Sequence, residues 1–371
     1  MKKILVFMMA LMVLVANVAC AAQTPASESQ KEVQQTEPEA QTDDTAEEDE
    51  IVIGLAMINH TSPSFVGILE GADEAAADYG CKNIWKSCEG NLDTQIDIVR
   101  GFIQQKVDVI MIDSVDVNGL VDVVNEATDA GIDVLGIGSP IPGKANYNAT
   151  YPNKDDDTFI ARFLGNLYKD EQDATIGLII GTIGNNVSDS RQQAFEATMK
   201  NEFPQFNIVT GLGAWDPTTS MTAAADIINA NNNIIHMHVI QDGMANGAIK
   251  AVQQSGKDIT MTSENGDPEG IENVINGNYL MNNLTGNARI GYWFEAICYY
   301  IAKGQEMDTT QLLHTYRIMS EEYQQMAKDW EINYNDAGEE LDMVTPEEAQ
   351  KIASAYKQEF GPDVWIPTLT N

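Results

Sequence analysis

From residue 51 onward, short apolar runs alternate with longer stretches in which apolar residues recur every three or four positions. The short runs are typical of buried strands and the longer stretches of amphipathic helices, because side chains return to one face with a period of about 2 in a strand and about 3.6 in a helix. The predicted strands are 51–57, 82–86, 107–112, 132–137, 175–181, 207–212, 234–239, 258–262 and 279–283. The predicted helices are 65–79, 92–105, 116–130, 155–169, 188–202, 217–231, 242–255, 268–276 and 287–303. Strands that alternate with helices over short joints predict βαβ units and parallel sheets.

The strand–helix alternation occurs in two series, one before residue 150 and one after it. Because residues 51–371 also exceed the usual length of one domain, we expect an α/β fold of two doubly wound parallel-sheet lobes. Ligands of such sheets bind in the crevice outside the carboxyl ends of the strands. The loops at those ends are 58–65, 113–116, 138–142, 181–191, 213–217, 240–243 and 263–268.

The first 20 residues form a separate pattern, in which two lysines precede an apolar run from residue 4 to residue 18. This is the pattern of a secretory signal, and the run is shorter than the ~20 residues needed to span a bilayer. Small residues follow, with Cys20 where bacterial lipoproteins carry their lipid, although Asn17 replaces the usual branched apolar residue. We expect a signal peptide at 1–20 and a lipid on Cys20. The alternative is an ordinary signal peptide cleaved near Ala21.

Residues 21–50 are rich in Gln, Thr, Ala, Ser and acidic residues, and Val33 is their one branched aliphatic side chain. Such a segment buries too little apolar surface to offset the entropy of an ordered chain, so we expect a disordered acidic tether. As a flexible chain, it would span a root-mean-square distance of roughly 30 Å. A tether of this kind suits a globular domain held at a lipid anchor.

Charge and cysteine content narrow the range of partners. The formal net charge is −35, of which residues 21–50 contribute −9 through ten acids and one lysine. The remainder is still acidic, which argues against nucleic acid and anionic membrane surfaces as partners. Cys81 and Cys88 lie at opposite ends of a predicted strand, about 20 Å apart, so they cannot pair. With Cys298 they are interpreted as buried thiols.

No catalytic motif is found in the predicted loops. Gly54 stands alone in the first strand, the segment 181–184 lacks the spacing of a dinucleotide fingerprint, and neither a phosphate-binding loop nor a GxSxG turn occurs. His236 and His238 share one face of a predicted strand, but no Cys or acid is spaced to complete a metal site. We therefore expect core histidines satisfied by their neighbours, no metal, no cofactor and no enzyme activity.

Several segments share their order and spacing with one known family. In the first half they are IGLAMINHTSPSFVGILEGADEAAADYG from residue 53, LDTQIDIVRGFIQQKVDVIMI from residue 92 and AGIDVLGIG from residue 130. In the second half they are SRQQAFEATM (190–199), AWD (214–216), QDGMANGAIKAV (241–252) and ENGDPEGIENVINGNYL (264–280). Over residues 51–319 the chain resembles the ribose/galactose-type, or type I, periplasmic binding proteins. Repressors of the lac family share this core fold, but they would begin with a helix-turn-helix instead of a signal sequence.

The resemblance implies two lobes joined by three crossings, near 151–154, 284–287 and 314–317. The N-terminal lobe would comprise 51–152 plus 287–314, and the C-terminal lobe 153–286 plus 315–319. Residues 320–371 form an extension that we expect to pack on the C-terminal lobe. The segment from Thr345 to Glu348 has the pattern of a capping box with proline at the first helical position, which predicts a helix at 346–359.

The resemblance also implies a set of ligand-binding residues, which are Ser62, Ser64, Phe65, Ser139, Arg191, Trp215, Gln241, Asn265 and Thr285. A polyhydroxylated ligand needs flat apolar faces and planar hydrogen-bonding groups. Phe65 and Trp215 would supply the faces, and Arg191 the main charged contact. The alternatives are ordinary core packing for Phe65, a surface aromatic for Trp215 and a solvated helix charge for Arg191. Gly138 and Ser139 replace an Asp-Arg pair that grips sugar hydroxyls in the family, which leaves the identity of the sugar open.

By this resemblance the chain is an extracytoplasmic, monomeric solute-binding component of an ABC importer. It would bind a small polar ligand, a sugar, between its lobes and deliver it to membrane permease subunits. Two other classes fit the same sequence. One is a lipoprotein sensor that presents a ligand or a quorum signal to a membrane receptor. The other is a secreted hydrolase that uses Asp116 or Glu264 with Asp242.

Overall fold

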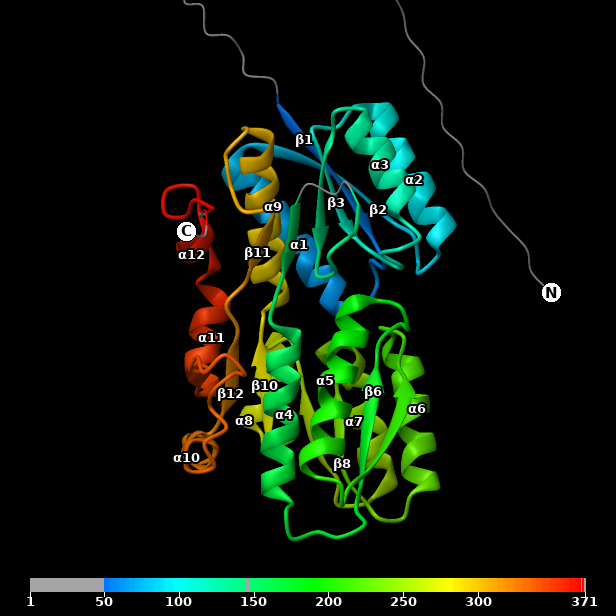
Figure 1. Cartoon of the computed structure of the whole chain (residues 1–371), viewed down its shortest axis with the longest axis vertical. Coiled ribbons are helices and arrows are strands. Elements are labelled where there is room, and N and C mark those ends of the chain that lie inside the picture. Colours follow the sequence, from blue (N-terminus) through cyan, green and yellow to red (C-terminus); the bar gives the residue numbers. More distant parts are fainter. Residues whose placement is uncertain (1–49, 144–146, 368, 370–371) are drawn as a thin grey trace, which may run out of the picture. The chain divides into compact units, whose positions relative to one another are not determined.

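The computed structural model describes residues 50–143, 147–367 and 369. These residues form two α/β lobes, each built around one sheet (Figure 1). The signal peptide and Cys20, and nearly all of the acidic tether predicted at 21–50, lie outside the described residues. Among the described residues, no helix is long and apolar enough to cross a membrane.

The N-terminal lobe contains a six-stranded sheet in the order β11-β5-β4-β3-β1-β2, and every neighbouring pair is parallel. Alternate side chains of β1 enter two cores: Ile53 and Leu55 pack with α1 and α9, whereas Ala56 packs with α2 and α3. The helices therefore cover both faces of the sheet. The elements of this lobe are β1 (Ile51–Met57), α1 (Pro63–Tyr79), β2 (Cys81–Ser87), α2 (Leu92–Gln105), β3 (Val109–Asp113), α3 (Val121–Asp129), β4 (Asp133–Ile137), β5 (Tyr147–Thr150), α9 (Asn287–Ala302) and β11 (Thr310–Leu312).

The C-terminal lobe contains a seven-stranded sheet in the order β13-β12-β10-β9-β8-β6-β7. Its pairs are parallel except for β10 with β12. The elements of this lobe are α4 (Asn153–Leu167), β6 (Thr175–Ile180), α5 (Asn186–Glu202), β7 (Asn207–Leu212), α6 (Pro217–Ala230), β8 (Ile234–Val239), α7 (Asp242–Ser255), β9 (Thr260–Ser263), α8 (Pro268–Ile275), β10 (Met281–Leu284), β12 (Tyr316–Met319), α10 (Glu321–Asp329) and β13 (Met343–Val344). Two doubly wound lobes are the predicted fold class, which the structure confirms.

Three segments connect the two sheets: one after β5, one between β10 and α9, and one between β11 and β12. Buried arginines lie beside two of them. Arg317 forms an ion pair with Asp156 of α4, and Arg289 donates from Nη1 to the carbonyls of Thr285 and His314. Because Arg289 contacts two crossings at once, it fixes their spacing at the hinge.

Local structure departs from the predicted elements where turns or very short strands occur. The predicted helix at 116–130 begins only at Val121, because the Asp116 carboxylate accepts from the backbone N–H groups of Asn118 and Gly119 and holds a turn. Strands β5, β11, β12 and β13 have two to four residues, too few to show a period. The helix at 346–359 is divided at Ala355 into α11 (Pro346–Ser354) and α12 (Tyr356–Phe360).

The C-terminal extension contacts both lobes, so the prediction that it packs on the C-terminal lobe is wrong for its last part. Strand β13 pairs with β12, and α11 packs on α8. In contrast, the carbonyl of Phe360 accepts from Tyr79 Oη of α1 at 2.6 Å, and the carbonyl of Trp365 accepts from Tyr300 Oη of α9 at 2.7 Å. The last residues of the extension, including Phe360 and Trp365, therefore pack on the N-terminal lobe.

Candidate ligand-binding site

A cavity lies between the two lobes, at the carboxyl ends of β3, β4, β8 and β9. The space open to the centres of water-sized molecules is about 50 Å³. Adding the radius of a water molecule on every side gives a cavity on the order of 200 Å³ for a compact shape, which suits one sugar ring. Its lining consists of Ile58, Phe65, Ile68, Asp113, Ile137, Gly138, Tyr151, Asn185, Val187, Arg191, Trp215, Gln241, Asn265, Asn287, Ile290 and Phe294.

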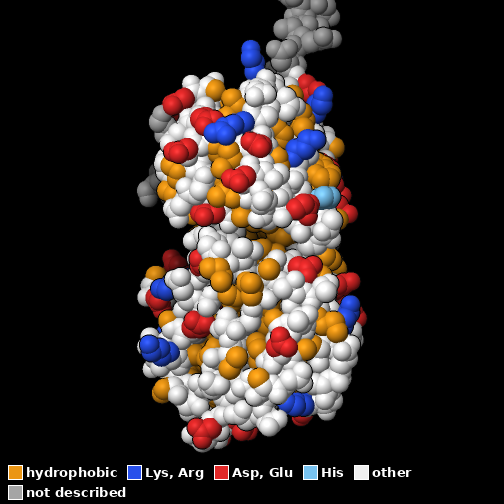
Figure 2. All heavy atoms as spheres, turned by 90° about the vertical axis from the view of Figure 1, so that its right-hand side faces the viewer, with side chains coloured by type: hydrophobic (Ala, Val, Ile, Leu, Met, Phe, Trp, Pro, Cys, Tyr) orange, Lys and Arg blue, Asp and Glu red, His pale blue; other side chains and the backbone are white. Residues whose placement is uncertain are grey.

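Hydrogen bonds join the lobes close to this cavity. Ser64 Oγ of α1 donates to Asp267 Oδ2, 3.1 Å away and just before α8. Asn185 Nδ2, at the start of α5, donates to the carbonyl of Ser114 after β3, at 3.0 Å. Figure 2 shows hydrophobic side chains at the narrow region between the lobes. The lobes therefore close over the cavity and would shield a ligand from solvent.

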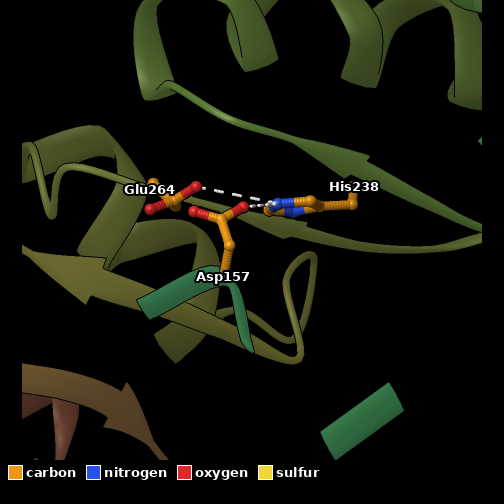
Figure 3. Close-up of side chains that lie close together, drawn as sticks. All are labelled: Asp157, His238 and Glu264. Carbon is orange, nitrogen blue, oxygen red and sulfur yellow. Dashed lines mark hydrogen bonds and ion pairs between the residues drawn. The ribbon is translucent and has the colours of Figure 1, made fainter. Parts of the chain in front are cut away.

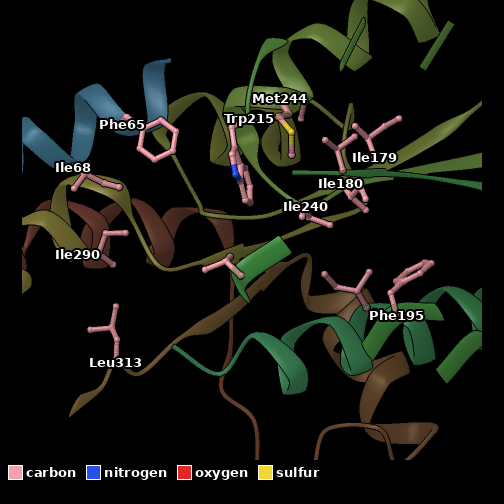
Figure 4. Packing of buried hydrophobic residues seen from close by; sticks show 14 of the residues in the cluster. Phe65, Ile68, Ile179, Ile180, Phe195, Trp215, Ile240, Met244, Ile290 and Leu313 are labelled. Carbon is pink, nitrogen blue, oxygen red and sulfur yellow. The ribbon is translucent and has the colours of Figure 1, made fainter. Parts of the chain in front are cut away.

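Two aromatic rings, one from each lobe, line the cavity, and Figure 4 shows both side chains. Phe65 comes from α1 of the N-terminal lobe and is 5% exposed, and Trp215 comes from the C-terminal lobe and is also 5% exposed. Trp215 has a left-handed backbone, with φ of 60°, so the turn is strained to hold the ring in place. A side chain at Gly181 would put Cβ 2.3 Å from the Trp215 ring. Trp215 is thus a buried wall of the cavity and not a surface aromatic.

Arg191 of α5 is the charged donor of the C-terminal lobe, and it is 1% exposed. Its Nε donates to Asn153 Oδ1 at 2.8 Å, and its Nη1 donates to the carbonyl of Ile240 and to Asn265 Oδ1. Burial opposes the positive charge, yet Glu264 and nearby acids raise the pKa of Arg191 above its ordinary value. The side chain is therefore a fixed buried cation that lines the cavity, which excludes the alternative of a solvated helix charge.

Polar side chains continue from Arg191 along the cavity. Gln241 directly precedes α7 as its N-cap residue, and its Oε1 is buried without a hydrogen bond from any described residue. Asn265 has φ of 109°, and its Nδ2 donates to Asn287 Oδ1 at 3.2 Å. An unpaired buried acceptor is costly, so Gln241 is suited to accept from a ligand hydroxyl.

The sequence did not assign Asp113, which the structure places in the cavity at the end of β3. Burial raises the pKa of this carboxyl to about 7. The sequence signal for Asp113 was its position in the loop 113–116, at the carboxyl end of a predicted strand. Tyr151 and Asn287 also line the cavity, at the first two predicted crossings.

Four of the nine predicted ligand-binding residues do not line the cavity. Ser64 Oγ donates to Asp267 Oδ2, and Thr285 Oγ1 donates to the Asn265 carbonyl at 3.3 Å. Ser62, at the start of α1, and Ser139, next to the lining residue Gly138, are both buried. Their hydroxyls have no hydrogen-bond partner among the described residues.

A second polar group of side chains is formed by Asp157, His238 and Glu264 (Figure 3). It contacts Arg191, whose Nε lies 3.5 Å from Glu264 Oε2. His238 Nε2 lies 3.2 Å from Asp157 Oδ1 and 3.6 Å from Glu264 Oε1. All three side chains are fully buried. The sequence predicted that His236 and His238 would be core histidines with ordinary neighbours. Asp157 and Glu264 belong to other elements, so spacing along the chain did not indicate that they would meet His238.

Comparisons with known proteins agree with this architecture. The model of the periplasmic binding protein domain family matches residues 53–306. The ribose import binding protein RbsB of Bacillus subtilis (strain 168) is 25% identical over 227 residues, which cover 61% of this chain and 73% of that protein.

Two solved structures show the same fold. A galactofuranose binding protein superposes with a TM-score of 0.68 at 22% identity and covers 76% of this chain and 98% of its own. An ABC transporter solute binding protein from Bacillus halodurans C-125, with bound myo-inositol, gives a TM-score of 0.67 at 20% identity and covers 82% of this chain and 98% of its own. The chain belongs to the periplasmic binding protein domain family, in its ribose/galactose-type branch, and its relatives are solute-binding proteins and not enzymes.

Proposed function

We propose that this chain is the solute-binding component of an ABC importer and that it captures one monosaccharide-sized polyol between its lobes. The observation that carries the proposal is the closed cavity itself. Flat aromatic walls on opposite lobes, Phe65 and Trp215, flank hydrogen-bonding side chains such as Arg191 and Gln241. This combination matches the needs of a ring that has apolar faces and hydroxyl edges.

The distribution of polar groups suggests how the ligand is oriented. Most of the lining residues that the N-terminal lobe supplies are apolar, such as Ile58, Phe65 and Ile137. Among the described lining residues of this lobe outside the crossings, Asp113 is the one with a polar side chain. The amides and the guanidinium come from the C-terminal lobe and the crossings. We expect the ligand to direct most of its hydroxyls toward the C-terminal lobe, one toward Asp113, and a less polar face toward the N-terminal lobe.

The known ligands of similar proteins support a polyhydroxylated substrate. The relatives are named for ribose and galactofuranose, and one similar structure contains myo-inositol. These compounds share a small ring with several hydroxyl groups. Ring size and hydroxyl pattern, which differ among them, are the variables that a ligand screen has to cover.

Delivery to a membrane permease, a lipid on Cys20 and a monomeric state complete the proposal. The secretory signal pattern and the acidic segment 21–50 support anchoring outside the cytoplasm. A tether of roughly 30 Å would let the two lobes reach a permease in the same membrane.

A thermal unfolding screen tests the proposed ligand class. The purified protein is heated with pentoses, hexoses, furanoses, deoxysugars and inositols, with amino acids as a control set of small polar compounds. A ligand that binds only the folded protein raises the midpoint. We expect a rise with at least one sugar or inositol and none with the amino acids. A rise with amino acids alone would contradict the proposal.

A further inference from the structure

The polar cluster behind the cavity brings together three side chains from three elements. Asp157 lies on α4, His238 on β8 and Glu264 directly after β9 (Figure 3). One donor atom from each lies within 4.8 Å of the others. An imidazole with two carboxylates is a donor set that divalent first-row metals accept.

Threonine hydroxyls link the two histidines. Thr260 Oγ1 lies 2.7 Å from His236 Nδ1, and Thr262 Oγ1 lies 3.0 Å from His236 Nε2. Because a hydroxyl can both donate and accept, these contacts are compatible with either neutral tautomer of the ring.

The same Thr262 hydroxyl lies 2.9 Å from His238 Nδ1. The other ring nitrogen, Nε2, faces Asp157 Oδ1 and Glu264 Oε1. In the tautomer with its proton on Nδ1, Nε2 presents a lone pair toward these two carboxyl oxygens, and a positive ion among the three atoms would satisfy all of them. In the other tautomer, a proton on Nε2 takes the place of that ion and is donated to Asp157 Oδ1.

The separations fit a metal ion. With bonds of 2.0–2.1 Å to nitrogen and oxygen, the ligand atoms of a tetrahedral zinc site are about 3.3 Å apart. The observed separations from His238 Nε2 are 3.2 Å to Asp157 Oδ1 and 3.6 Å to Glu264 Oε1. Moreover, Glu264 Oε1 is fully buried and has no hydrogen-bond partner among the described residues.

The surroundings resemble the outer shell of a metal site, in which ligands are held by further hydrogen bonds. His238 Nδ1 contacts Thr262, and Glu264 Oε2 lies 3.5 Å from Arg191 Nε and accepts from Asn283 Nδ2 at 3.4 Å. Two buried arginines pair with neighbouring acids, Arg191 with Glu264 and Arg317 with Asp156.

We propose that Asp157, His238 and Glu264 bind a divalent first-row cation, with Zn²⁺ as the preferred ion, inside the C-terminal lobe. The cation neutralises Asp157 and Glu264 together, and Asp156 remains paired with Arg317. The charge of Arg191 is then free to act on the cavity that it lines. The rival occupant is a proton shared by the same three groups.

Metal analysis of the purified full-length protein separates the two. We expect about one zinc per chain after dialysis against a weak chelator. After partial unfolding with a strong chelator and refolding, Zn²⁺ should raise the unfolding midpoint by roughly 5–10 °C, whereas Mg²⁺ should not. Refolding with Co²⁺ should produce the visible absorption of a low-coordinate cobalt site. A metal-free protein whose midpoint and spectrum do not respond to these ions would overturn the proposal in favour of the proton.

Matched variants test direct ligation. Glu264→Gln keeps the size of the side chain, and His238→Gln removes the imidazole; both should lose the bound zinc and the cobalt absorption. His236→Gln changes the neighbouring histidine on the same strand face and should retain the metal. Equal loss in all three variants would show that core disruption, and not ligation, governs the metal content, and would also overturn the assignment. None of these readouts depends on identifying the sugar.

Discussion

Replacing Arg191 by lysine should weaken both the empty protein and its complex with ligand. Lysine keeps the charge but lacks the planar fork of donors. The arginine donates to Asn153, to the Ile240 carbonyl and to Asn265. A lysine side chain ends in a single ammonium group, which cannot reach all three acceptors. A hydrogen bond to a charged group contributes roughly 1.5–3 kcal/mol. Losing one or two of them costs on the order of 3 kcal/mol of unfolding free energy.

With an unfolding entropy of about 2.1 cal/mol/K per residue over roughly 320 folded residues, 1 kcal/mol corresponds to about 1.5 °C in the unfolding midpoint. Arg191→Lys should therefore lower the midpoint by roughly 4–5 °C. Loss of the aligned donor should cost a further 2–3 kcal/mol or so in ligand binding, a decrease in affinity of roughly 30- to 150-fold. Calorimetric scanning of the empty protein and titration with the ligand measure the two effects. An unchanged midpoint with binding within twofold of the wild type would refute the reasoning.

Three further predictions concern the cavity and the anchor. In Gly181→Ala the new methyl group would lie 2.3 Å from the Trp215 ring, so ligand affinity should fall at least tenfold by calorimetry; unchanged affinity would mean that the ring is not a wall. Asp113→Asn should stabilise the empty protein increasingly as pH rises from about 4 to about 7, because the folded pKa lies above the ordinary one and ionisation of the buried carboxyl costs stability in that window; a pH-independent difference in unfolding midpoint would contradict this. Cys20→Ala should move the protein from the membrane fraction to the soluble fraction, as measured by immunoblotting, and equal retention would exclude lipid anchoring through Cys20.

The fold was predictable because its signals are local. Each buried strand of the parallel sheets is an apolar run, and helix ends carry their own marks, such as the capping box at Thr345 that the structure contains. The short strands and the path of the extension were not predictable in this way. Phe360 and Trp365 reach the N-terminal lobe through contacts with Tyr79 and Tyr300, which are far away in sequence.

The cavity was predictable only in part, for a similar reason. Phe65, Arg191 and Trp215, which the family resemblance implied as ligand-binding residues, line the cavity. The resemblance could not show that Ser64 would bond across the lobes to Asp267, since that contact exists only when two separate loops meet. The cluster around His238 is likewise assembled from α4, β8 and the turn after β9, and no spacing rule connects them.

The central claim is that both lobes hold one ligand, and calorimetric titration of two variants tests it most directly. Phe65→Ala removes a wall supplied by the N-terminal lobe, and Gln241→Ala removes an acceptor supplied by the C-terminal lobe. With the sugar or inositol found by the screen, the wild type should bind one molecule per chain, and each variant should bind at least tenfold more weakly. Wild-type affinity in either variant would contradict the account, because the ligand would then be held by one lobe alone.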